Sequence, residues 1–139
     1  MNRQAPLAGL PLLVRRAWWA AGWFGIGLVI YLSLMRNPPS IPVEQGDKLE
    51  HIAAYAMLMF WFAHLDPDRR RRQWMALALL ALGVGLEFVQ GMTDYREFSV
   101  ADMAADAIGI GGGWLLAPPR LPSLLAFAQR VAARIAPSA

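Results

Sequence analysis

The chain has 139 residues, of which 57% are hydrophobic and 17% are charged, and its net charge is +3. Soluble domains are typically about 45–50% apolar and about 25% charged, so this composition favours a membrane protein. The absence of cysteine excludes disulfides, thiol catalysis and cysteine-ligated metal ions. The basic residues fall in short runs beside apolar segments, which is typical of membrane topology and argues against a nucleic-acid partner.

The first apolar segment follows a short basic lead. Residues 1–16 carry three arginines and show no clear periodicity, so we expect a cytoplasmic N-terminal lead. Residues 17–35 are uncharged, and 19 residues at about 1.5 Å each span roughly 28 Å, which predicts a transmembrane helix. A cleaved signal peptide is the competing interpretation, but no small-x-small cleavage site follows.

Three further helices are predicted, over residues 48–65, 74–90 and 100–117. The prolines and glycine of residues 36–46 separate the first two helices. Asp66 is placed as an N-cap with Pro67 at the first helical position, and the arginines at 69–72 are expected at the surface. The predicted fold is therefore all-α: a polytopic membrane protein with a four-transmembrane-helix bundle over residues 17–117.

The last segment, residues 118–139, is predicted to be a cytoplasmic amphipathic tail. Its apolar residues between 121 and 135 fall on one helical stripe, and its arginines lie off that stripe. Such a helix would lie on the cytoplasmic leaflet. A weakly ordered tail is the alternative.

The distribution of basic residues predicts the orientation. Arg36, Lys48 and Arg96 lie at one end of the predicted bundle, and the remaining arginines lie in the lead, the 66–73 loop and the tail. The positive-inside rule then predicts a multi-pass protein of the cell inner (plasma) membrane with both termini cytoplasmic.

This topology gathers polar residues at the outer end of the bundle. Asp47, His51 and Tyr55 recur every fourth residue, so they share one helix face. A carboxyl at the depth of Asp106 costs about 2–3 kcal/mol on insertion scales, so it should face the protein interior and have a partner. The complete predicted group comprises Asp47, Lys48, His51, Tyr55, Glu87, Gln90, Arg96, Asp102 and Asp106.

The last predicted helix also carries small residues at every fourth position. Ala101, Ala105, Gly109 and Gly113 form a ridge on which another helix can approach closely. We interpret this ridge as packing, not chemistry.

Three short motifs together resemble the VanZ-like family of small integral membrane proteins. They are D-K-x-x-H-x-x-x-Y from Asp47, E-x-x-Q from Glu87, and R-x-x-S-x-x-D-x-x-x-D from Arg96, followed by a glycine-rich helix. Asp106 departs from the family pattern, which often has Asn there. The family is named for a protein associated with reduced susceptibility to the glycopeptide teicoplanin, so the resemblance implies a membrane protein of the cell envelope.

Several of these residues also have purely structural interpretations. Asp47 with Glu50, and Ser99 with Asp102, both fit capping boxes. His51 would then make a structural hydrogen bond to Glu87 or Asp102. Glu87 would be a buried strut, neutral or paired with Arg96, and Tyr55 would be a packed core residue.

Three functions fit the predicted site. The first is recognition of an amphipathic envelope lipid, a cell-wall intermediate or a lipoglycopeptide, with Lys48 and Arg96 meeting its anionic groups. The second is an enzyme acting on a lipid-linked substrate, with His51 and Glu87 as acid and base. The third is a transporter, whose full pathway would need homo-oligomerisation, or a structural subunit of an envelope complex.

No cofactor is predicted, because no segment has a spacing diagnostic for one. Asp47, His51, Glu87, Asp102 and Asp106 nevertheless offer one imidazole and several carboxylates, which suit Mn, Mg or Zn. A metal-dependent variant of the enzyme is the alternative to a metal-free site.

Overall fold

The computed structural model describes residues 11–66 and 68–118 of the chain. They form helices α1 (Leu12–Leu34), α2 (Gly46–Leu65), α3 (Arg69–Gln90) and α4 (Val100–Leu116). The all-α prediction and the order of the four helices are confirmed. The predicted tail helix and most of the N-terminal lead lie outside the described residues.

Three helices begin earlier than the sequence predicted: α2 by two residues, and α1 and α3 by five each. α1 starts at Leu12, so the last residues of the expected lead are helical. α3 starts at Arg69, and its N-cap is Asp68, whose Oδ1 accepts the N–H of Arg71 at 2.8 Å. The prediction of Asp66 as the N-cap is wrong because its Oδ1 instead accepts the N–H of Asp68 at 2.9 Å, closing the turn before the helix.

Arg72 corrects the prediction that all four arginines lie at the surface. Its side chain is buried, and it donates to the backbone carbonyls of Asp66 and Pro118. The first turn of α3 points the guanidinium inward, where free carbonyls at the ends of α2 and α4 satisfy it. Arg72 thus ties together the three helix ends at this side of the bundle.

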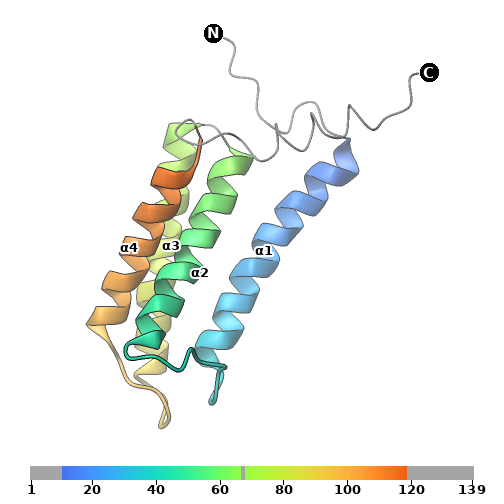
Figure 1. The fold of residues 1–139 in the computed structure, drawn as a ribbon. Coiled ribbons are helices and arrows are strands. Elements are labelled where there is room, and N and C mark those ends of the chain that lie inside the picture. The colour runs from blue at the N-terminus through green and yellow to red at the C-terminus, as the bar shows by residue number, and fades with distance from the viewer. Residues whose placement is uncertain (1–10, 67, 119–139) are drawn as a thin grey trace, which may run out of the picture.

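Helices α2, α3 and α4 form one group, and α1 lies on the side of α2 away from α4 (Figure 1). The closest pair is α2 and α4. A Cβ atom at Gly109 would collide with the carbonyl of Ile52, and one at Gly113 with that of Ala56. The predicted small-residue ridge is therefore confirmed for Ala105, Gly109 and Gly113, although Ala101 is exposed.

The core is built mainly on α2. Tyr55, Leu58, Met59 and Phe62 are buried there, and Leu79 of α3 is among the residues of the other helices that pack with them. Towards α1, the indole N–H of Trp61 donates to the carbonyl of Trp18 at 3.1 Å. α2 thus contacts each of the other three helices and packs most extensively against α4.

Two helices, α1 and α3, are long and apolar enough to cross a membrane. The same length and composition also occur in signal sequences near an N-terminus and in core helices of soluble proteins. Within the most apolar stretch of each helix, 6% of the residues of α1 and 28% of the residues of α3 are buried, so neither is a mostly buried core helix.

Candidate functional site

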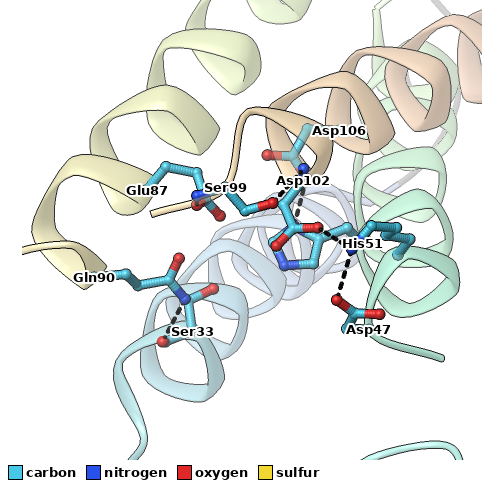
Figure 2. A network of polar contacts seen from close by, with 9 residues as sticks. Ser33, Asp47, His51, Glu87, Gln90, Ser99, Asp102 and Asp106 are labelled. Carbon is cyan, nitrogen blue, oxygen red and sulfur yellow. Dashed lines mark hydrogen bonds and ion pairs between the residues drawn. The ribbon is translucent and has the colours of Figure 1, made fainter. Parts of the chain in front are cut away.

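The candidate site lies at the end of the bundle where the loops 35–45 and 91–99 connect the helices (Figure 1). Side chains from α2, α3 and α4 converge there (Figure 2). The predicted convergence of residues distant in sequence is therefore observed, and its internal pairing differs from the pairing we expected.

His51 pairs with Asp106. Its Nδ1 lies 2.8 Å from Asp106 Oδ1, whereas the sequence pointed to Glu87 or Asp102 as the partner. Asp106 is 1% exposed, so the expectation that this carboxyl faces the interior and has a partner is confirmed. The close approach of α4 to α2 explains the pairing, because it places the second turn of α4 beside the second turn of α2.

Gly83 of α3 makes room for Asp106. A Cβ atom at this position would collide with Asp106 Oδ2 and would lie 3.0 Å from the hydroxyl of Tyr55. Sequence reasoning missed Gly83, and its only signal there was a small residue one turn before Glu87. Tyr55 itself is buried in the core and reaches the site through its hydroxyl.

Glu87 and Ser99 join α3 to the start of α4. Ser99 is the N-cap of α4, and its Oγ accepts the N–H of Asp102 at 3.2 Å. In a complete capping box Asp102 would accept the N–H of Ser99, but Glu87 Oε2 does so here, at 2.9 Å. The carboxylate of Asp102 therefore makes no capping hydrogen bond and is available to pair with other side chains. Glu87 is a buried carboxylate that accepts its hydrogen bond from the backbone of Ser99 and not from Arg96.

Lys48 bridges two carboxylates. Its Nζ lies 2.8 Å from Asp47 and 3.2 Å from Asp102. Asp47 is not a helix cap, because the N-cap of α2 is Gln45 and carries no side-chain cap hydrogen bond. The ammonium of Lys48 is thus engaged within the protein, whereas Arg96 lines the cavity described below.

Gln90 serves as a tie between helices. Its side-chain amide donates to the carbonyl of Ser33 at 2.8 Å, and Tyr95 donates to the carbonyl of Leu34 at 3.1 Å. Both contacts hold the end of α1 against α3 and the loop after it. Gln90 lies beside the carboxylates in Figure 2, but its side chain is hydrogen-bonded to α1.

A cavity of about 390 Å³ opens beside this network, between α1, α2 and the loop 35–45. Val29 and Leu32 of α1 contribute apolar walls, and His51, Tyr55 and Arg96 also line it. Sequence reasoning assigned the site to α2, α3 and α4 and missed the contribution of α1. Residues 17–34 of α1 are uncharged and held no signal for it.

The loop 35–45 is fastened to the first turns of α2, which fixes this wall of the cavity. The N–H of Ile41 donates to Glu50 Oε1 at 2.5 Å. A Cβ atom at Gly46 would collide with the carbonyl of Ile41, so the glycine permits the close approach. Glu50 therefore secures the loop and does not complete a capping box with Asp47.

One subset of the site has the donor atoms of a metal centre. A ring nitrogen of His51 and one carboxylate oxygen each from Glu87 and Asp102 all lie within 4.8 Å of one another. The three residues come from α2, α3 and α4.

The chain is similar to the uncharacterized protein C11E3.10 of Schizosaccharomyces pombe, with 31% identity over 94 residues. The aligned region covers 66% of this chain and 58% of the yeast protein, so the chain spans little more than half of that relative. No protein-family model matches the chain, and no solved structure matches it.

Proposed function

We propose that this protein is a multi-pass membrane protein of the cell envelope that binds an amphipathic lipid in the cavity between α1 and α2. The observation that carries the proposal is the cavity itself: about 390 Å³, with apolar walls and with His51, Glu50 and Arg96 among its lining residues. This volume lies within the usual range of ligand sites, about 300–1,000 Å³, and apolar walls with a few polar groups are typical of them.

The surface of α1 supports placement in a bilayer. Trp23, Phe24, Leu28 and Tyr31 are exposed on it. In water these side chains would form a large apolar patch, whereas in a bilayer they would contact acyl chains. We further propose that all four helices span the inner membrane with both termini cytoplasmic. In that arrangement the cavity lies towards the outer face.

The proposed ligand carries an anionic headgroup and an acyl tail. Arg96 would bind the headgroup, and the apolar walls would accept the tail. The resemblance to the VanZ-like family makes lipid-linked cell-wall intermediates and lipoglycopeptides candidates, with a role in antibiotic resistance.

Native mass spectrometry of the detergent-solubilised protein tests the proposal. Ala54 lines the cavity and Ala53, next to it on α2, is exposed. We expect wild type and Ala53→Phe to carry a co-purified lipid and Ala54→Phe to lose it, because the ring fills the cavity. Equal lipid occupancy in the two variants would contradict the proposal.

An enzyme is the second candidate, and the His51–Asp106 pair favours it. An imidazole held by a buried carboxylate at the wall of a cavity has the arrangement of a general base. Asp106 would orient the imidazole. Glu87, which the sequence analysis predicted to act with His51 as acid and base, would then not be the direct partner of the imidazole. Conversion of the bound lipid over time by wild type but not by His51→Gln, at equal lipid occupancy, would establish the enzyme over the binding protein.

A further inference from the structure

We propose that His51, Glu87 and Asp102 bind one divalent first-row transition-metal ion, such as Mn²⁺ or Zn²⁺. Their three donor atoms come from three different helices and lie within 4.8 Å of one another (Figure 2). This inference does not rest on the proposed lipid, because the donor atoms belong to the protein alone.

The donor set has the right chemistry. One imidazole and two carboxylates suit Zn²⁺ and Mn²⁺. Metal–ligand bonds to these groups are about 2.0–2.2 Å, so two donors on one ion lie at most about 4.4 Å apart. The three donor atoms therefore need only small side-chain rotations to close on an ion. Since Glu87 Oε2 accepts from Ser99, Oε1 would be its ligand atom.

The imidazole is held as it is in many metal sites. Nδ1 is occupied by the hydrogen bond to Asp106 Oδ1, 2.8 Å away, which leaves the lone pair of Nε2 for an ion. Metal-ligating histidines usually make such a bond from their other nitrogen to a carboxylate, which fixes the ring and makes it a stronger ligand. Asp106 would therefore be the positioning residue of the site.

Asp106 also supplies an independent indication that a cation belongs here. Its second oxygen, Oδ2, is buried and has no hydrogen-bond partner within residues 11–66 and 68–118. A buried carboxylate with an unsatisfied oxygen is costly unless a positive charge lies nearby. An ion bound at Nε2 would strengthen the Nδ1–H that Asp106 Oδ1 accepts and would place positive charge near this carboxylate, while Oδ2 itself faces Gly83 of α3.

The net negative charge of the cluster also favours a bound cation. Glu87, Asp102 and Asp106 surround His51, and both Glu87 and Asp106 are only 1% exposed. Lys48 contacts Asp102, but it also pairs with Asp47. With a neutral imidazole these groups leave at least two negative charges, which one divalent ion would balance.

The site would lie beside the ligand cavity, because His51 lines that cavity. A bound ion would then lie beside a cavity that Arg96 also lines. Coordination positions of the ion not filled by the protein would be available to an oxygen of the phosphate or carboxylate of an amphiphile.

Mn²⁺ binding to the full-length protein in detergent tests the inference. After stripping with EDTA, the protein is titrated with MnCl₂, and free Mn²⁺ is followed by electron paramagnetic resonance. We expect one saturable site per chain, with affinity lowered at least tenfold in Glu87→Gln and in Asp102→Asn. Asp106→Asn should lower it about 10–100-fold, which is typical of losing the group behind a ligating histidine.

Asp94→Asn is the matched control, because Asp94 is an exposed carboxylate in the loop after α3. It should bind Mn²⁺ as wild type does. Equal affinity in all four variants would overturn the proposed site, as would the absence of saturable binding of Mn²⁺ and of Zn²⁺ in competition.

A second measurement needs no variant and so does not depend on how well variants fold. Electron spin echo envelope modulation of the wild-type Mn²⁺ complex should show coupling to an imidazole nitrogen of His51. Saturable binding without nitrogen coupling would also overturn the site. The Ala54→Phe variant should still bind Mn²⁺, so a failure of the lipid proposal and a failure of the metal proposal give different results.

Discussion

At the scale of single residues, His51 connects the two parts of the site. Its imidazole ring is hydrogen-bonded to the buried carboxylate of Asp106, and the same residue forms part of the cavity wall. A change to this one residue would therefore affect both ligand contact and the buried network. Lys48 has a narrower role, since both of its contacts are carboxylates of the protein.

The tight packing around Gly83 predicts that its substitution by alanine destabilises the protein. Gly83→Ala would force its Cβ against Asp106 Oδ2, displace the carboxylate from His51 and cost about 1–3 kcal/mol of stability through overpacking. We expect a lower thermal unfolding midpoint in detergent, together with weaker Mn²⁺ binding.

Gly85→Ala is the control on the same helix. A Cβ atom at Gly85 meets nothing within 4 Å, and alanine favours the helix by up to about 1 kcal/mol. Its unfolding midpoint should equal or exceed that of wild type. If the two substitutions had the same effect, the tight fit at Gly83 would not matter for stability.

At the scale of helices, the contact between α2 and α4 organises the bundle. Gly109 and Gly113 bring the backbone of α4 against carbonyls of α2. This approach brings Asp102 and Asp106 to Lys48 and His51. The site therefore depends on the close packing of α4 against α2 at this ridge.

Gly113→Ala tests the packing ridge. Its Cβ would collide with the carbonyl of Ala56, which is backbone and cannot rotate away, so the two helices would have to separate. We expect a loss of about 1–3 kcal/mol in the free energy of unfolding, measured by chemical denaturation in detergent. Gly112→Ala, whose Cβ meets nothing within 4 Å, should leave this free energy unchanged or raised. A Gly113→Ala variant as stable as wild type would contradict the tight contact, and unchanged Mn²⁺ binding would show that the site does not depend on this contact.

At the scale of the whole molecule, the two described ends of the chain and the turn between α2 and α3 lie at one end of the bundle (Figure 1). The candidate site lies at the other end. An even number of membrane crossings would put the site on the side away from the termini, which we propose is the outer face.

Cysteine labelling tests this orientation, and the lack of native cysteine makes single-cysteine variants unambiguous. Asp94 and Arg70 are both exposed, at opposite ends of the bundle. A membrane-impermeant maleimide should label Asp94→Cys in intact bacterial cells and Arg70→Cys only after lysis. The reverse pattern would place the site on the cytoplasmic side, and labelling of both in intact cells would contradict an integral membrane arrangement.

Much of the fold could be predicted from the sequence, because helix order depends on local signals. Apolar segments of helical length, separated by prolines and charged turns, were enough to place all four helices. Helix starts were predicted less well: Asp66 and Asp68 both fit an N-cap, and only the hydrogen bonds distinguish them.

Helix direction and residue spacing follow from the chain, so local patterns were enough to predict which residues gather at one end of the bundle. The pairing among them depended on how the helices pack. His51 meets Asp106, and Glu87 meets the backbone of Ser99, because glycines set how closely α4 and α3 approach their neighbours. The cavity likewise depends on where α1 packs, and the uncharged residues 17–34 of α1 carry no local signal of that position.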